Sequence, residues 1–461
     1  MNLLNTKFRF QTLFLSALIF LAAIGCTVEN NSQSEAVTQS LISHPEWTKS
    51  ANIYEVNIRQ YSPEGTFNAF RKDLPRLKEM GVDILWLMPI HPIGEKKRKG
   101  ELGSYYSIRD YRGINPNFGT LNDFKTLVDS SHALGMKLII DWVPNHTAWD
   151  HPWVTEHPEY YAKDSTGAIT YEADWTDIAL LNYDNKDLWP KMIDAMKYWI
   201  NEANIDGFRV DHAAHEIPMA FWEKAVPEID SEKEGLFWLA EWNDPKLHPV
   251  FDASYPWEYF HMTTEIADQN TPLTAIDEYM AKEDSLFPEH AYRMYFTSNH
   301  DENSWNGTDR ELFGANFQNF AVLAATIDGM PLVYNGQESG LYQQLEFFKK
   351  DTLNWKDYKY QDFYATLFDL KDRNEALWNG QYGGEFVKVA NDKPEVVYSF
   401  KRVKGEYEVF VILNLSDNAQ SVNFPEISSE AIYTNVFARE EQVVGGEPIE
   451  IKSHSFLVLE K

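Results

Sequence analysis

Short apolar runs recur along residues 53–334, and several of them end in polar or ionisable residues. Continuous apolar runs of this length are typical of parallel strands that are buried on both faces. Segments with helical spacing of apolar residues separate the runs, for example 70–80, 121–134 and 186–202. Strands that alternate with helices predict a parallel sheet, here closed into a barrel. We expect barrel strands at residues 53–58, 84–88, 138–143, 207–211, 237–241, 251–255, 292–298 and 331–334.

The run Gly-Phe-Arg-Val-Asp at residues 207–211 has two faces of opposite character. Phe208 and Val210 would share one face of the strand, and Arg209 and Asp211 the other. A barrel with its reaction site at the strand tips would use such a charged face. Because a neighbouring cation lowers the pKa of a carboxyl group, we expect Arg209 to keep Asp211 ionised, as a nucleophile requires. A purely structural Arg–Asp pair is the alternative that this run leaves open.

Three further runs lead into polar motifs. They begin at Leu138, Phe237 and Tyr292 and lead into Asp-Trp-Val-Pro-Asn-His at 141–146, Ala-Glu-Trp at 240–242 and Ser-Asn-His-Asp at 298–301. The carboxyl ends of parallel barrel strands meet at one face of the barrel. Four such motifs in one chain therefore predict a shared active face.

With these motifs in this order, residues 50–461 resemble the α-amylase family of glycoside hydrolases. The resemblance implies an α/β fold whose catalytic (β/α)8 TIM barrel spans residues 47–379. An inserted loop domain would follow the third strand at about 147–185. Short alternating strands joined by Gly, Asp and Asn turns predict a separate C-terminal antiparallel β domain at 380–461.

The resemblance also assigns roles to residues. Asp211 would be the nucleophile, Glu241 the general acid/base, and Asp301 the carboxylate that holds sugar hydroxyls in the transition state. The remaining substrate-binding residues would be Tyr106, Asp110, His146, Arg209 and His300. The implied activity is hydrolysis of α-1,4 bonds, with retention, in starch-derived glucans or maltooligosaccharides. A transglycosylase or isomerase on the same residues, or a non-catalytic glucan-binding lipoprotein, are the alternatives.

Many members of this family hold a structural calcium ion between the barrel and the insert. Asn145 and His215 match two of its contributors. Leu180 and Asn182, however, stand where the family carries acidic residues, and calcium prefers charged oxygen ligands. We therefore expect calcium to bind weakly or not at all.

The N-terminus predicts export. Lys7 and Arg9 precede an apolar run at residues 13–24 that is too short for a comfortable membrane span, as in a signal peptide at 1–25. The sequence Ala-Ile-Gly-Cys at 23–26 resembles a bacterial lipobox, so Cys26 would be lipidated and residues 26–46 would form a flexible tether. We expect a membrane-anchored exported lipoprotein on the periplasmic or cell-surface face, and an ordinary secretory signal with an incidental Cys26 is the alternative. Cys26 is the only cysteine of the chain, so no internal disulfide can form.

The charge of the chain restricts its partners. A net charge of −29 argues against binding to nucleic acid and against adsorption to anionic membranes, because both require basic patches. A neutral sugar is compatible with this charge. The aromatic residues, 15% of the chain, include enough flat faces for stacking on sugar rings, although most must serve in ordinary packing.

Overall fold

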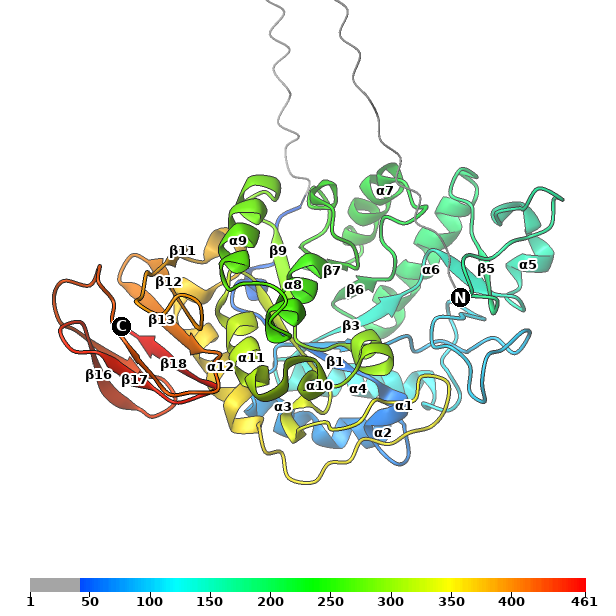
Figure 1. Cartoon of the computed structure of the whole chain (residues 1–461). Helices are drawn as coiled ribbons and strands as arrows, with labels where there is room; N and C mark the ends of the chain where they lie inside the picture. The colour runs from blue at the N-terminus through cyan, green and yellow to red at the C-terminus, as the bar shows by residue number, and fades with distance from the viewer. Residues whose placement is uncertain (1–41) are drawn as a thin grey trace, which may run out of the picture. The chain divides into compact units, whose positions relative to one another are not determined.

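The computed structural model describes residues 42–461, and within them eight parallel strands close into a barrel (Figure 1). Their order around the barrel is β1-β10-β9-β8-β7-β6-β3-β2. The sequence-based prediction of a (β/α)8 barrel is confirmed. The strands are β1 (Ile53–Val56), β2 (Ile84–Leu87), β3 (Lys137–Trp142), β6 (Gly207–Val210), β7 (Phe237–Ala240), β8 (Ala253–Ser254), β9 (Tyr292–Tyr295) and β10 (Met330–Tyr334).

Every predicted barrel strand is present, although several are shorter than the apolar runs. β2 is buried along its whole length, as its unbroken apolar sequence predicts. The first strand ends at Val56 because the side chain of Asn57 accepts a hydrogen bond from Gln60 N and caps a short helix, α1 (Ile58–Tyr61). Hydrophobic runs predict that a strand exists more reliably than where it ends.

Helices follow the strands and cover the barrel (Figure 1). The predicted helix at 70–80 is divided into α2, a 3-10 turn and α3, and α3 has Pro75 in its first turn, where a missing N–H costs nothing. The helices are α2 (Phe67–Phe70), α3 (Leu74–Glu79), α4 (Leu121–Ala133), α6 (Leu188–Ala203), α7 (Met219–Asp230), α8 (Trp257–Ala267), α9 (Thr274–Leu286), α10 (Asp309–Phe313), α11 (Phe317–Thr326) and α12 (Gln361–Arg373).

Gly207, the first residue of β6, is required by close packing against the next strand. Its φ is +147°, and a Cβ placed on it would lie 1.9 Å from the carbonyl oxygen of Phe237 in β7. Beyond this point Phe208 packs against Trp238 with ring centroids 5.2 Å apart, while Arg209 is fully buried among polar groups. The two faces predicted for this strand are therefore real.

The insert after β3 is built on a small antiparallel pair, β4 (His146–Ala148) with β5 (Ile178–Leu180). Between these strands lies one short helix, α5 (Trp153–Glu156). His146 pairs with Leu180 in this ladder, so the insert is anchored directly at the end of the β3 motif.

Antiparallel strands form the C-terminal part, as predicted. A sheet of order β11-β12-β13-β18-β15-β16 is accompanied by a smaller pair, β14 with β17, and apolar residues of both, such as Phe410, Val444 and Ile449, form one buried cluster. Asn319 in α11 donates a hydrogen bond to the carbonyl of Asn414, which joins this sheet to the barrel helices. The strands are β11 (Glu385–Lys388), β12 (Val397–Lys404), β13 (Tyr407–Asn414), β14 (Gln420–Val422), β15 (Ala431–Asn435), β16 (Glu440–Val444), β17 (Ile449–Ile451) and β18 (Ser455–Glu460).

The predicted signal peptide, Cys26 and most of the predicted tether lie outside the described residues. Packing begins before the predicted end of the tether at residue 46, because His44 is buried with its Nδ1 2.6 Å from Asp252 Oδ1. Among residues 42–461, no helix has both the length and the apolar character needed to cross a membrane.

Candidate active site

A cavity of about 600 Å³ lies where the barrel strands end. Asp211 directly follows β6, Glu241 directly follows β7, and His300 and Asp301 follow β9 within a few residues. This is the face of a barrel that carries reaction sites. The cavity is lined by six of the residues predicted from sequence: Tyr106, His146, Asp211, Glu241, His300 and Asp301.

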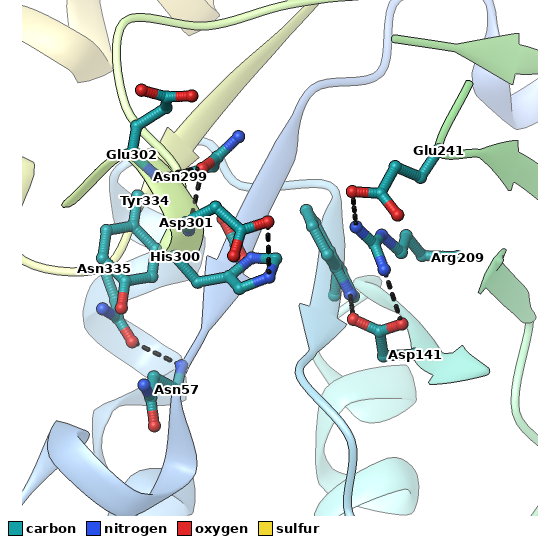
Figure 2. Close-up of polar contacts among 12 residues, drawn as sticks. Asn57, Asp141, Arg209, Glu241, Asn299, His300, Asp301, Glu302, Tyr334 and Asn335 are labelled. Atoms are coloured by element: carbon teal, nitrogen blue, oxygen red, sulfur yellow. Dashed lines mark hydrogen bonds and ion pairs between the residues drawn. The ribbon is translucent and has the colours of Figure 1, made fainter. Parts of the chain in front are cut away.

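Arg209 joins the carboxylates on one side of the cavity. Its Nη1 lies 3.0 Å from both Asp141 Oδ1 and Asp211 Oδ1, and its Nη2 lies 2.8 Å from Glu241 Oε1. Figure 2 shows the guanidinium between Glu241 and Asp141. A buried guanidinium with several carboxylate partners orients them rigidly, because its donors lie in a fixed plane. Arg209 thus positions both groups that the chemistry needs.

Asp211 has one oxygen paired and one free. Oδ1 accepts from Arg209, whereas Oδ2 is buried and has no hydrogen-bond partner among the described residues. Burial raises the pKa of Asp211 to about 6, although His212 and Arg209 lower it. Arg209 lowers this pKa, as expected, but desolvation outweighs the ion pair, so the pKa lies above its ordinary value. At neutral pH the carboxylate is still mostly ionised, and its unpaired oxygen can attack.

Glu241 stands close to Asp211. One oxygen of each carboxylate and one ring nitrogen of His212 all lie within 4.8 Å of one another. Burial raises the pKa of Glu241, but Arg209, His212 and the backbone N–H of His212 together bring it below its ordinary value. That N–H donates to Glu241 Oε2 at 2.9 Å. His212 adopts φ +47°, a conformation uncommon for a side chain other than glycine, and the resulting turn aims its N–H at the carboxylate.

His300 forms the opposite side of the site (Figure 2). Its Nδ1 lies 2.5 Å from Glu55 Oε1, and its Nε2 lies 2.6 Å from the Tyr106 hydroxyl and 3.3 Å from Asp301 Oδ2. Burial lowers the pKa of His300, but Asp301 and Glu55 raise it to about 9, so the ring is a cation at neutral pH. A charged imidazole between carboxylates can donate from both nitrogens.

Tyr106 presents its ring to the cavity. The ring stacks on His300 at a centroid distance of 5.4 Å, and the hydroxyl donates to Asp141 Oδ2 at 3.1 Å. Tyr105, its neighbour in sequence, points elsewhere and is buried under the guanidinium of Arg59. Tyr106, which the resemblance assigned to substrate binding, is therefore the tyrosine of this pair that lines the cavity.

His146 and Asp110 differ in position. His146 is buried against the cavity, and burial lowers its pKa to about 3, so it is neutral at any pH of interest. Asp110 is exposed, does not line the cavity, and accepts a hydrogen bond from Arg112 N within its own turn. The structure thus brings His146 to the site and leaves Asp110 outside it.

The residues at the place of the family's calcium site do not fit a calcium ion. Asn145 Nδ2 donates to the carbonyl oxygen of His215 at 2.9 Å, so the two expected calcium ligands are hydrogen-bonded to each other. Asn182 Oδ1 accepts from Asp184 N at 3.1 Å and caps a turn. Calcium requires six to eight oxygen ligands, preferably charged. The imidazole of His215 lies 2.6 Å from Glu172 Oε1, and this contact links the barrel motif to the insert.

Three residues that contact the predicted site residues directly were not selected from the sequence: Glu55, Asp141 and His212. Glu55 carried a detectable signal, because an acidic residue stands inside an otherwise apolar strand run and is fully buried. Asp141 opens the motif at 141–146 and holds both Arg209 and Tyr106. His212 had no signal beyond its place after Asp211.

Comparisons with known proteins agree with this geometry. The family model described as the catalytic domain of α-amylase matches residues 30–175 and 163–408. An α-amylase structure from Lactobacillus plantarum superposes with a TM-score of 0.82 at 29% identity, covering 90% of this chain and 99% of that one. A noncanonic maltogenic α-amylase from Thermotoga neapolitana gives a TM-score of 0.80 at 31% identity over the same shares. An α-1,4-glucan:maltose-1-phosphate maltosyltransferase of Picrophilus torridus is 27% identical over 91% of this chain and 69% of its own length.

Proposed function

The chain belongs to the α-amylase family of enzymes that act on glucans, and we propose that it is a retaining glycosidase that hydrolyses α-1,4 bonds in maltooligosaccharides or starch-derived glucans. The observation that carries the proposal is the carboxylate pair. Oxygens of Asp211 and Glu241 lie within 4.8 Å of each other. Retaining glycosidases hold their carboxyl groups about 5–5.5 Å apart, whereas inverting enzymes leave about 6.5–9.5 Å for a water molecule.

The proposed reaction has two displacements. Asp211 Oδ2 attacks the anomeric carbon while Glu241 donates a proton to the departing glycosidic oxygen, which leaves a covalent glycosyl-enzyme. Glu241, now ionised, then takes a proton from water, which attacks the same carbon and releases the sugar. Asp301 and the cationic His300 bind ring hydroxyls more tightly as the ring flattens, which lowers the barrier selectively.

Transfer of the glycosyl group to a sugar acceptor is the second candidate function, and the similarity to a maltosyltransferase supports it. Transfer would use the same first step and replace water by an acceptor hydroxyl or phosphate. A product assay separates the two: incubation with maltotriose should yield only shorter sugars, and addition of inorganic phosphate should leave the products unchanged. Products longer than maltotriose, or maltose 1-phosphate, would favour transfer.

We propose the location from sequence alone. Residues 1–25 would direct export, and lipidation of Cys26 would anchor the enzyme to a membrane, with the folded part facing the periplasm or the cell exterior. A non-catalytic glucan-binding lipoprotein is the weaker reading, because binding alone does not require two carboxylates arranged around one guanidinium.

A further inference from the structure

Residues 94–104, between β2 and α4, form a strap beside the cavity. The sequence of residues 94–103, with four consecutive basic residues at 96–99, predicts a solvated loop, and contact with the substrate is the alternative. In the structure, Lys99 and Ser104 line the cavity, and the N–H of Tyr106, two residues after Ser104, donates to Ser104 Oγ at 3.1 Å. The strap is therefore part of the site.

One side of the strap is tied to the insert. Lys99 Nζ donates to the carbonyl oxygen of Asp174 at 2.5 Å and lies 3.7 Å from Asp177 Oδ1. Lys97 Nζ lies 3.3 Å from the ring centroid of Trp149, a cation–π contact. Asp174 and Asp177 themselves line the cavity, so the strap meets this wall at its inner surface.

The other side of the strap is tied to the loop after β10. Leu102 N donates to the carbonyl of Phe348 at 2.9 Å, and the buried Arg59 donates to the carbonyls of Gly103 and Phe347 at 3.2 and 2.9 Å. A Cβ on Gly100 would lie 2.4 Å from Phe348 Cβ, so the strap passes this wall in close contact. Phe347 and Phe348 also line the cavity. The strap thus bridges two walls of the cleft.

The position of the strap relative to the reacting bond follows from the roles of the site residues. Glu241 serves the leaving group, whereas Tyr106, His300 and Asp301 hold the sugar whose anomeric carbon reacts. The strap runs into Tyr106, and Phe347 stacks behind the Tyr106 ring at 6.4 Å with an interplanar angle of 10°. Trp305, 55% exposed, extends this aromatic wall with its ring 5.2 Å from Phe347. The bridge therefore lies beside the residues assigned to the sugar whose anomeric carbon reacts.

We propose that residues 94–104 close the cleft on this side, so that the enzyme takes the non-reducing ends of α-glucan chains instead of their interior bonds. The inference rests on the proposed function and adds the mode of attack. A chain end has a free 4-hydroxyl group and fits against the strap with Trp305 and Phe347 as flat platforms for its rings. An interior segment would have to pass through the strap.

Two p-nitrophenyl maltoheptaosides test this directly, one free and one with a 4,6-O-ethylidene group on its non-reducing glucose. Products are separated by chromatography. We expect the free substrate to be cleaved at least about tenfold faster, since even small misfits in a closed pocket cost that much. Equal rates would overturn the closed cleft while leaving glucan hydrolysis intact. Cleavage of neither substrate would overturn the proposed function and this inference with it.

Variants of the strap provide the second measurement. For each variant, the rate with the free substrate is divided by the rate with the ethylidene-blocked substrate, so that a general loss of activity cancels. Replacing residues 95–101 by two glycines should bring the ratio close to one. Lys99→Ala, which removes the contacts with Asp174 and Asp177, should also lower the ratio, but by less than the deletion. Lys96→Ala removes the same charge from an exposed position of the strap and should keep the wild-type ratio. A wild-type ratio in both the deletion and Lys99→Ala would show that the strap does not limit access.

Discussion

Arg209 Nη2 lies 2.8 Å from Glu241 Oε1, so the carboxyl group proposed as the general acid rests against a buried cation. Burial opposes the charge on Glu241, but Arg209 and His212 hold its pKa below the ordinary value. A general acid must carry a proton when the bond breaks. Substrate binding must therefore raise this pKa, and exclusion of water by the bound sugar is the physical means, because desolvation favours the neutral carboxyl group.

The separate roles of Asp211 and Glu241 predict different responses to azide. Glu241→Gln removes acid help, worth about 10²–10⁴-fold with ordinary leaving groups, but should still form the glycosyl-enzyme from α-glucosyl fluoride. Azide needs no base, so it should restore turnover and give the α-azide. Asp211→Asn should give no α-azide under the same conditions. The opposite pattern would exchange the two roles, and β-anomeric sugar released by the wild type, seen by proton NMR, would exclude double displacement.

The pH dependence of kcat/KM for α-glucosyl fluoride, whose departure needs little acid help from Glu241, should have two limbs. Activity should fall as the pH decreases through about 6, because Asp211 with its raised pKa becomes protonated and cannot attack. It should fall again as the pH increases through about 9, where His300 loses its proton. Glu55→Gln removes one cause of the raised pKa of His300 and should shift the upper limb to lower pH. Glu79→Gln, on the exposed side of α3, should shift neither limb.

The raised pKa of His300 also predicts a stability change. Because the pKa is about 9 in the folded protein and has an ordinary value of 6.5, this group stabilises the folded state fully below pH 6.5. The contribution is lost as the pH rises through about 9. Urea unfolding at pH 6 and pH 10 should show a larger loss of unfolding free energy in the wild type than in Glu55→Gln, and equal losses would contradict the assignment.

Calcium should contribute little to stability. The side chain of Asn145 donates to the His215 carbonyl, and Leu180 and Asn182 supply no carboxylate where the family carries acidic residues. An ion that bound only the native state would raise the melting temperature with its concentration. We expect a chelator to leave the melting temperature unchanged. Strong destabilisation that calcium reverses and magnesium does not would contradict this prediction.

Gly207→Ala should be strongly destabilising. The new Cβ would meet the Phe237 carbonyl at 1.9 Å, and φ of +147° is strained for alanine. Backbone strain and overpacking together suggest a loss of about 2–6 kcal/mol in unfolding free energy. Gly167→Ala is the matched control, because its φ is +84° but nothing lies within 4 Å of the added Cβ. If the two variants lose equal stability by chemical denaturation, the contact with β7 is not the cause.

Lipidation can be tested on the full chain. Cys26→Ser should abolish incorporation of a labelled fatty acid and should leave an uncleaved precursor or release soluble enzyme. Absence of label on the wild-type protein would refute the anchor.

The sequence alone determined the barrel, the C-terminal sheet and the principal carboxylates. Buried parallel strands are apolar along their length, so their positions can be recognised locally, and a polar motif after a strand marks the active face. The motifs after the strands indicated this face, the resemblance to the α-amylase family singled out Asp211, Glu241 and Asp301, and all three line one cavity. Strand ends were less predictable, because a cap such as Asn57 decides them.

Only the tertiary structure decided which distant residues meet and what charge they carry. Glu55 and His300, 245 residues apart, form one pair, and burial overrides Arg209 in setting the pKa of Asp211. Asp110 matches a motif yet faces outward, whereas Lys99, in a loop expected to be solvated, lines the cavity. The physical reason is common to these cases: desolvation and pairing depend on neighbours brought by the fold, and a linear pattern records only a residue's own polarity and its neighbours along the chain.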